Sequence, residues 1–530
     1  MNIIIYDFGT SNVKTCLFDI DSDIKLKASS SASYSLYISD DGGAEQDTEE
    51  WWSALCSTTK ELFKKSDIKP GEIDGVAFCS QMQGTVLVDK NGNALRRPMT
   101  YLDQKGFKEY KECMGRGIIK ISGCSLYKLL RNLLVNYAAS VSAKDPVWKY
   151  KWVEKNEPDI FEKTYKWLDV GEYLVARCTG RIIRTPDSAF ATFLYDTRKG
   201  KEGWNKGLLK MYKVKREHMA EIIDCADIAG GLTEKAASDL GLQAGTPVFG
   251  GGGDTTFVNI GAGCTKPGDT HIYMGTSGWV STYLDYQTVD LNAMITGVLS
   301  AKHGYFNFYA ELETAGKCYE WALNNLALDA IDVYSKKTDV TDDSESDYDS
   351  LYDYLSEAAG RVPPGANGVI FTPWLHGNRC PFEDSNAAGM FFNIRVDNGK
   401  GDMIRAVLEG VCYHLRWLLE CQASKVKTSD TIRFVGGGSL SPVICQMLSD
   451  ITGRTVETVD NPQEVGAAGT ALSVAAKIKG VDVLELAKRL VKANHTYIPD
   501  PANKEVYERN YRVFKKLYKS NAANFKSLNS

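Results

Sequence analysis

Two segments of the chain place a glycine beside two hydroxyl side chains, a combination suited to binding phosphate. They are IYDFGTS at residues 5–11 and, about half a chain later, IYMGTS at residues 272–277. In each, an apolar run leads into Gly-Thr-Ser and a second apolar run closes on Asp19 or Asp285, which predicts strand, tight turn and strand. Glycine lets backbone N–H groups approach an anion, and the hydroxyls add donors. Two such turns predict a nucleotide held from both sides.

The repetition predicts a duplicated fold. A single Gly-Thr-Ser is a weak signal, because many hairpin turns carry small polar residues. Internal similarity at half-chain spacing is typical of two related lobes. The chain has 530 residues, which exceeds one core and fits two domains of roughly 250 residues each. We place the boundary in the glycine-rich stretch from Leu242 to Gly253, which gives domains 1–248 and 249–530.

Asp254 is the candidate catalytic base. It follows four glycines, so substrate can reach its carboxylate without obstruction from neighbouring side chains. Phosphoryl transfer to a hydroxyl needs such a proton acceptor, a metal bridging the phosphates, and donors around the transferred group. Asp7, beside the first turn, is the candidate ligand for Mg²⁺, directly or through water. Lys14 could add positive charge near the phosphates. The alternative for Asp254 is an ordinary aspartate in a turn.

The remaining skeleton alternates strands and helices. Residues 75–79 predict a buried strand that runs into the polar cluster Gln81, Met82, Gln83 and Gly84, and residues 85–89 predict another strand. Polar side chains at a strand's end are well placed for ligands. Thr48 is the predicted cap of a helix to about residue 65. Further helices are predicted at 147–156, 170–178, 314–327, 403–419, 441–452 and 507–525, and residues 117–147 are predicted as extra helical material.

Composition restricts the function classes. The chain has 62 basic and 67 acidic residues, a formal net charge of −5, so we expect neither nucleic acid nor a membrane as partner. The acidic stretch 339–349 is predicted as a solvated loop. The thirteen cysteines show no C-x-x-C pair or zinc spacing. No apolar run of 18 residues and no signal sequence are found, so we expect a soluble cytoplasmic protein with a small-molecule partner.

Gly436-Gly437-Gly438, between a strand and a helix, would let a flat ring lie close to the backbone. The chain has no Walker-type G-x-x-x-x-G-K-[ST] motif and no His-Arg-Asp set, which disfavours the P-loop and protein-kinase folds.

Taken in order, these motifs resemble the FGGY family of carbohydrate kinases over nearly the whole chain. The matching segments include residues 7–11, 45–47 with Trp51-Trp52, 81–84, 252–254, 275–277, 377–381, 405–410, 436–438 and 464–469. The resemblance implies an α/β, two-lobed actin-like ATPase fold, related to ribonuclease H, with duplicated domains and a cleft between them. It implies a sugar kinase that uses ATP and Mg²⁺, with sugar bound mainly by the first domain and ATP mainly by the second.

The resemblance also implies roles for individual residues. Asp254 would deprotonate the sugar hydroxyl, and Thr10 and Thr276 would face the γ-phosphate from the two lobes. The implied ATP contacts are Gly9, Thr10, Ser11, Asn12, Lys14, Gly275, Thr276, Gly316, Glu320, Gly437, Gly438 and Pro442. The implied sugar contacts are Gln81, Met82, Gln83, Gly84, Tyr101, Asp103 and Thr255.

The sequence favours D-xylulose as the sugar and leaves others open. Glycerol kinases of this family have Arg-Glu where this chain has Met82-Gln83, and xylulose kinases have Met-His-Gly. Here the histidine is Gln83, a frequent Asn after the catalytic Asp is Thr255, and Tyr101 replaces a Trp. Because hydroxyl recognition depends on such polar groups, ribulose, another pentulose, erythritol or another polyol, and gluconate or another sugar acid stay open.

The competing class is a non-catalytic member of the actin-like superfamily. A sugar-sensing regulator usually carries an added helix-turn-helix, and a chaperone-type ATPase needs a peptide-binding module. The sequence after Gly469 leaves about 60 residues, and Asp254 is present. We therefore expect an enzyme, with a homodimer as an open expectation.

Overall fold

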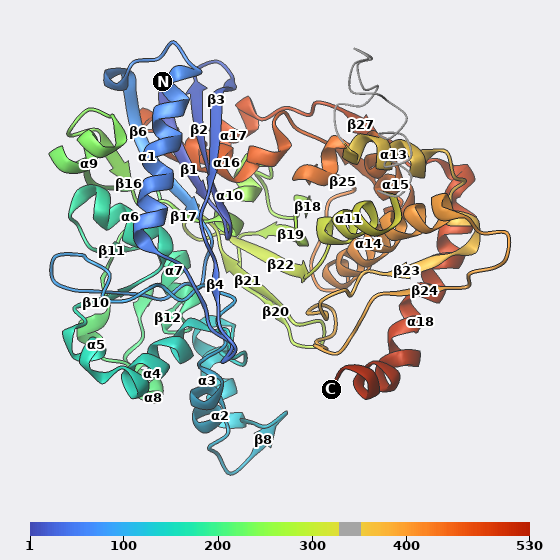
Figure 1. The fold of residues 1–530 in the computed structure, drawn as a ribbon, viewed down its shortest axis with the longest axis horizontal. Helices are drawn as coiled ribbons and strands as arrows, with labels where there is room; N and C mark the ends of the chain where they lie inside the picture. Colours follow the sequence, from blue (N-terminus) through green and yellow to red (C-terminus); the bar gives the residue numbers. More distant parts are fainter. Residues whose placement is uncertain (328–350) are drawn as a thin grey trace, which may run out of the picture.

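The computed structural model describes residues 1–327 and 351–530, so the acidic stretch 339–349 lies outside the described residues. Each half of the chain forms a mixed β-sheet with helices on its faces, and Figure 1 shows the first half on the left and the second on the right.

The first sheet has the strand order β15-β16-β6-β1-β2-β3, with β17 also paired to β6. Strands β1, β2 and β3 are antiparallel neighbours, whereas β6 runs parallel to β1 and β16 parallel to β6. The strands are β1 (Asn2–Phe8), β2 (Asn12–Ile20), β3 (Ile24–Ser33), β6 (Ile73–Ser80), β15 (Ile228–Gly231), β16 (Pro247–Phe249) and β17 (Gly252–Gly253).

The second sheet repeats this plan. Its order is β20-β21-β22-β19-β18-β25-β26-β27. Strands β18, β19 and β22 are antiparallel neighbours, β25 runs parallel to β18, and β26 parallel to β25. The duplication predicted from the two Gly-Thr-Ser turns is therefore confirmed. The strands are β18 (Thr270–Met274), β19 (Gly278–Leu284), β20 (Val289–Asp290), β21 (Ile295–Leu299), β22 (Phe306–Leu312), β25 (Thr431–Val435), β26 (Thr455–Glu457) and β27 (Thr496–Tyr497).

Seventeen helices are described, together with short strands outside the two sheets. The helices are α1 (Thr48–Lys64), α2 (Phe107–Met114), α3 (Leu126–Asn136), α4 (Pro146–Asn156), α5 (Pro158–Lys163), α6 (Val170–Thr179), α7 (Pro186–Ala191), α8 (Lys206–Tyr212), α9 (Glu234–Leu240), α10 (Asp254–Gly261), α11 (Gly316–Ala322), α13 (Leu351–Gly360), α14 (Lys400–Ala423), α15 (Pro442–Thr452), α16 (Val465–Lys479), α17 (Val483–Leu490) and α18 (Lys504–Asn529). The short strands are β4 (Tyr37–Ile38), β5 (Ala44–Glu45), β7 (Val86–Val88), β8 (Lys120–Ile121), β9 (Cys124–Ser125), β10 (Lys166–Leu168), β11 (Ile183–Arg184), β12 (Tyr195–Asp196), β13 (Gly203–Trp204), β14 (Glu221–Ile222), β23 (Ile370–Thr372) and β24 (Met390–Phe392).

The two faces of β1 enter different parts of the core, because successive side chains of a strand point to opposite faces. Ile4 and Tyr6 pack in a cluster with the side chains of α1, α6 and α9. Ile3 and Ile5 pack in a cluster with α10 and α16 that also contains Trp279 of β19. Helices α10 and α16 therefore pack between the two sheets: α16 contacts β1, β2 and β6 of the first sheet, and α10 contacts α16 and β22 of the second.

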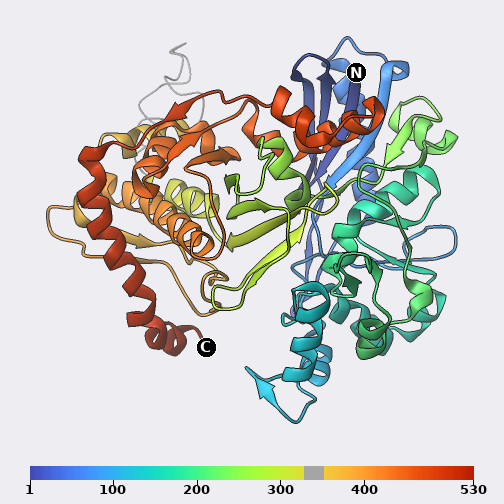
Figure 2. The same cartoon turned by 180° about the vertical axis from the view of Figure 1, so that it is seen from behind.

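Two local predictions were wrong. Thr48 is the first residue of α1, and the cap is Asp47, whose Oδ1 accepts a hydrogen bond from the Glu49 backbone nitrogen at 2.8 Å. The region 117–147 is not all helical, because β8 and β9 form a hairpin before α3. Ser122 and Gly123 have φ angles of 49° and 81°, as a tight two-residue hairpin turn requires. This hairpin projects from the lower end of the first half (Figure 2).

The predicted domain boundary falls within a strand of the first sheet. Strand β16 spans the boundary at 248/249 and β17 lies just after it, yet both strands pair with β6 of the first sheet.

The C-terminal helix α18 docks through Tyr507, Tyr511 and Phe514 into the core of the second half, as its amphipathic pattern predicted.

Candidate active site

The first Gly-Thr-Ser turn joins β1 to β2. The Gly9 backbone nitrogen donates to the Asn12 carbonyl at 3.0 Å, and the Tyr34 hydroxyl donates to the same oxygen at 2.9 Å. Thr10 Oγ1 donates to the Tyr101 hydroxyl at 3.2 Å. Ser11 and Asn12 are exposed. The turn is therefore tied to its surroundings while its tip stays open.

The second turn joins β18 to β19 and is fixed to the start of α11. The Gly316 backbone nitrogen donates to the Gly275 carbonyl at 2.8 Å, and the Lys317 backbone nitrogen donates to the Thr276 carbonyl at 3.0 Å. A Cβ on Gly316 would lie 2.3 Å from the Gly275 oxygen, so this close approach requires glycine. Glu320, on the same helix, pairs with Lys317 at 3.0 Å.

The triple glycine lies against the end of β18, next to the second turn. Gly436 has a φ of 87°, and a Cβ there would lie 2.6 Å from the Met274 carbonyl oxygen. A Cβ on Gly438 would meet the Met274 sulfur at 2.5 Å. Gly437 begins a short 3₁₀ turn after it, and Pro442 begins α15 with an exposed ring. The structure thus brings Gly275, Gly316 and the loop 436–438 together around the end of β18, while the roles of these residues, Glu320 and Pro442 toward ATP stay predictions.

Asp254 is the first residue of α10, directly after β17. Its Oδ1 accepts from the Thr255 backbone nitrogen at 2.7 Å. Burial raises the pKa of Asp254 to about 6, and the charge of Asp187 adds to the rise. Burial also raises the pKa of Asp7, to about 7, and the charge of Asp254 contributes to it. The two carboxyl groups therefore lie close enough to interact, with pKa values in the range that suits proton transfer near neutral pH.

The predicted sugar cluster 81–84 follows β6 and adjoins Asp254. Met82 Sδ accepts from Thr255 Oγ1 at 3.4 Å. The backbone nitrogens of Gln83 and Gly84 donate to the two carboxylate oxygens of Asp169, at 2.9 and 2.7 Å. Gln83 has a φ of 64°, a conformation that these contacts hold in place.

A buried lysine supports the same loop. Lys149 Nζ on α4 donates to the carbonyl oxygens of Gln83 at 2.8 Å and Thr100 at 2.6 Å. Burial lowers the pKa of Lys149 to about 8. Neither Lys149 nor Asp169 was singled out from the sequence, because each resembles an ordinary helix or cap residue until its remote partner is known.

Gln81 connects the sugar cluster to the first turn. Its Nε2 donates to Gln46 Oε1 at 2.9 Å, and Gln46 Nε2 donates to the Thr10 carbonyl. Within residues 1–327 and 351–530, Gln81 Oε1 is buried and has no hydrogen-bond partner. Leaving a buried acceptor without a partner costs free energy, so this oxygen is suited to accept a hydrogen bond from a ligand hydroxyl.

Tyr101 and Asp103 differ in their surroundings. The Tyr101 hydroxyl meets Thr10, as given above. Asp103 is fully buried, and its carboxylate accepts from the backbone nitrogens of Ala44 at 2.9 Å and Lys105 at 3.1 Å. In this structure Asp103 therefore holds the loop that carries Tyr101, and its direct contact with sugar stays a prediction.

Comparison with known proteins gives the family. The N-terminal domain model of the FGGY family of carbohydrate kinases matches residues 2–261, and the C-terminal domain model matches residues 271–477. The chain belongs to this family. As an FGGY kinase it is a phosphotransferase, which implies ATP and a sugar as substrates, and it has the two-domain actin-like ATPase fold.

Relatives of this FGGY kinase act on more than one sugar. It is 26% identical over 520 residues to a xylulose kinase of Bacillus subtilis (strain 168), covering 97% of this chain and 96% of that one. It is 27% identical over 489 residues to a gluconokinase of the same strain, covering 90% and 88%. The crystal structure of ligand-bound xylulose kinase from Lactobacillus acidophilus matches with a TM-score of 0.83 at 22% identity, covering 99% of both chains; it supports the fold.

The oxygen donors at the site fit Mg²⁺. Asp7 is the second-last residue of β1, a half-buried carboxylate near Asp254. Across the described parts of the chain, no group of three His, Cys, Asp or Glu side chains could hold a metal. Separately, no helix in the described ranges is long and apolar enough to cross a membrane.

Proposed function

We propose that this FGGY kinase transfers the γ-phosphate of ATP to a hydroxyl of D-xylulose, giving xylulose 5-phosphate. The observation that carries the proposal is the position of Asp254. Asp254 is the first residue of α10, and the next residue, Thr255, contacts Met82 of the predicted sugar cluster 81–84. The xylulose kinase relatives support the choice of sugar.

Asp254 acts as the general base in this proposal. It takes the proton of the attacking hydroxyl as that oxygen forms a bond to the γ-phosphorus, and the bond from the γ-phosphorus to the β–γ bridging oxygen breaks, which releases ADP. Thr10 and Thr276 hold the transferred group from the two sides. When bound at Asp7, Mg²⁺ would neutralise phosphate charge. Water exclusion between the two halves favours transfer to sugar over hydrolysis.

The nucleotide occupies the second half in this proposal. The turn at Gly275, the start of α11 at Gly316 and the loop at Gly437 adjoin one another around the end of β18. Backbone close to a ligand at all three places suits phosphates and a flat base. Domain 1–248 then serves mainly the sugar and domain 249–530 mainly ATP.

Gluconate is the second candidate, because a gluconokinase is among the relatives. A sugar acid adds a negative charge that a cation must balance. Near the sugar cluster, Lys149 donates to two carbonyl oxygens, and Arg379 Nη1 pairs with Glu311 Oε2 at 3.2 Å. The carboxylates of Asp254 and Glu311 would repel another anion. These pairings favour an uncharged sugar.

The test is ADP release with Mg²⁺-ATP across D-xylulose, D-ribulose, L-ribulose, L-xylulose, erythritol, glycerol and gluconate. We expect D-xylulose to give the highest kcat/KM. Asp254→Asn should lower kcat by about two to four orders of magnitude while ATP still binds. Asp89→Asn is the matched control, because Asp89 also accepts backbone hydrogen bonds, from Asn91 and Asn93. Near-normal turnover of Asp254→Asn would show that Asp254 is not the general base. A higher kcat/KM with gluconate than with D-xylulose would show that D-xylulose is the wrong substrate.

A further inference from the structure

The turn that carries Asp254 is held from behind by a second carboxylate. Asp187 Oδ2 accepts hydrogen bonds from the Gly253 backbone nitrogen at 2.8 Å and from Thr256 Oγ1 at 2.7 Å. These two donors lie directly before Asp254 and two residues after it. The Asp187 side chain therefore binds both ends of the short segment that aims the proposed base.

The fit around this carboxylate is tight. Asp187 is 1% exposed. A Cβ on Gly252 would lie 2.7 Å from Asp187 Oδ2, and a Cβ on Gly253 would lie 2.1 Å from the Met82 sulfur. The two glycines thus let the turn sit between Asp187 on one side and Met82 of the sugar cluster on the other.

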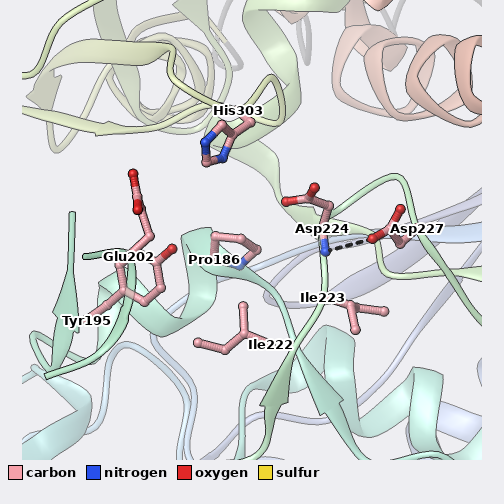
Figure 3. Close-up of a pocket in the computed structure, with 8 residues that line it drawn as sticks. All are labelled: Pro186, Tyr195, Glu202, Ile222, Ile223, Asp224, Asp227 and His303. Atoms are coloured by element: carbon pink, nitrogen blue, oxygen red, sulfur yellow. Dashed lines mark hydrogen bonds between the residues drawn. The ribbon is translucent and has the colours of Figure 1, made fainter. Parts of the chain in front are cut away.

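Asp187 is itself fixed by its element. It is the second residue of α7, and Cys225 Sγ donates to its Oδ1 at 3.5 Å. Pro186, one residue earlier, lines a cavity of about 430 Å³ with Ile222, Ile223 and Asp224 (Figure 3). The start of α7 and the segment before Cys225 therefore form a wall between this cavity and the turn. The wall keeps the carboxylate at Gly253.

We propose that Asp187 is a positioning residue of this kinase, which fixes the Gly252-Gly253-Asp254 turn so that the Asp254 carboxylate points at the sugar hydroxyl. The inference rests on the proposed role of Asp254 as the base. Among the residues that the structure describes, the Asp187 carboxylate accepts hydrogen bonds only from Gly253, Thr256 and Cys225, so we infer that it acts on the reaction through Asp254.

The negative charge of Asp187 provides a measurable test of the positioning role, because it affects the pKa of Asp254, which a residue needed only for folding would not do. Several groups interact electrostatically with Asp254: they are Asp7 on β1, Cys79 on β6, Tyr101, Asp187 on α7, Tyr273 on β18, and Tyr309 and Glu311 on β22. Replacing Asp187 by Asn keeps the shape and one acceptor oxygen but removes one negative charge. The pKa of Asp254 should then fall, because a nearby negative charge favours the protonated carboxyl.

The experiment compares Asp187→Asn with wild type, using the sugar that responds best. We expect kcat to fall about 10-fold to 100-fold, by analogy with partners that orient metal ligands, with the KM for ATP within about twofold. On the acidic side of the pH profile, the pH at which kcat falls to half its maximum (the acidic limb) should move to a lower value, because the pKa of Asp254 is lower. Thr256→Val removes one of the two donors, so kcat should fall less and the limb should stay in place.

Asp196→Asn is the matched control. Asp196 is 4% exposed and accepts from Arg198 and Asn205, away from the turn. It should lower stability without moving the pH limb. If Asp187→Asn keeps wild-type kcat and pH profile while Asp254→Asn is inactive, the positioning role is wrong and the proposed function stands. If Asp254→Asn is itself active, the base assignment has failed instead.

A second variant tests the proposal in case Asp187→Asn fails to fold. If Asp187→Asn does not give a cooperative thermal transition, Gly252→Ala tests the same contact, because its methyl group would displace the Asp187 carboxylate. That variant should lower kcat with little change in the KM for ATP. Unchanged kcat in a folded Gly252→Ala protein would overturn the proposal.

Discussion

Lys14 of the first half and Glu464 of the second form an ion pair, with 2.9 Å between Nζ and Oε1. Lys14 faces Asp7 in the register of β1 and β2, and Glu464 directly precedes α16. Burial lowers and Glu464 raises the pKa of Lys14, with a net rise that keeps it charged. The side chain predicted to approach phosphate is therefore held beside Asp7 by a residue 450 positions away.

The ion pair predicts opposite effects of two substitutions on ATP. Lys14→Met removes the positive charge near the phosphates and should raise the Kd for ATP about fivefold, equivalent to about 1 kcal/mol. Glu464→Gln releases Lys14 without removing its charge, so the Kd should stay equal or fall. Isothermal titration with ATP measures both. An equal rise in the two variants would mean that Lys14 acts only through the ion pair.

Asp7 predicts a specific Mg²⁺ dependence. Asp7→Asn removes a carboxylate that a hydrated Mg²⁺ would contact, so the Mg²⁺ concentration for half-maximal activity should rise about 10-fold to 100-fold. At saturating Mg²⁺, activity should partly recover. Titration of Mg²⁺ at fixed ATP tests this. Asp23→Asn is the control, since Asp23 pairs with Lys25 at the turn after β2. Unchanged Mg²⁺ dependence in Asp7→Asn would remove Asp7 from the metal site.

Asp254 predicts a variant that is inactive and more stable. Its folded pKa of about 6 lies above the ordinary carboxyl value. Between about pH 4 and 6 the folded state therefore binds more protons than the unfolded state, so this group's contribution to stability falls as pH rises through that window. Asp254→Asn removes the cost, and Tm should exceed the wild-type value by about 1–3 °C at pH 7.5 and by less at pH 4.5.

A carboxyl with the opposite shift supplies the control. Partial burial of Asp89 is outweighed by hydrogen bonds from Asn93 and Asn91, which lower its pKa. Its contribution to stability is present at neutral pH and is lost as pH falls through the folded pKa. Asp89→Asn should therefore lower Tm at pH 7.5. A lower Tm in both variants at pH 7.5 would contradict the conclusion that the ionised Asp254 carboxylate destabilises the folded state.

Local patterns predicted the elements that carry the site. The turns at Gly9 and Gly275 were predictable because an apolar run, a glycine and a second apolar run lie within about 15 residues. The hairpin at Ser122-Gly123 was predicted as helical material, although its signal, a glycine after a small polar residue between two short strands, is also local. Cap choice between Asp47 and Thr48 depends on one residue's backbone angle, which neighbouring residue types do not decide.

Remote partnerships could not be predicted. Asp187 binds Gly253, Lys149 binds Gln83 and Asp169 binds Gln83, across 66, 66 and 86 residues. Each pair depends on how two elements pack, and a single sequence contains no signal for that. The same limit explains Asp103: its motif placed it beside Tyr101, but only the structure shows its carboxylate bound to the backbone of Ala44.

Gln83 predicts sugar preference independently of ATP. Its backbone is fixed by Asp169 and Lys149, so a substitution changes the side chain without moving the loop. Gln83→His should change the kcat/KM ratios between sugars by about 10-fold or more. A site that hydrogen-bonds a sugar hydroxyl discriminates against sugars that leave its polar groups unpaired. The KM for ATP should change less than twofold. Gln104→His, at an exposed position before α2, is the control for a surface histidine. Equal effects on sugar and ATP would place Gln83 outside the sugar pocket.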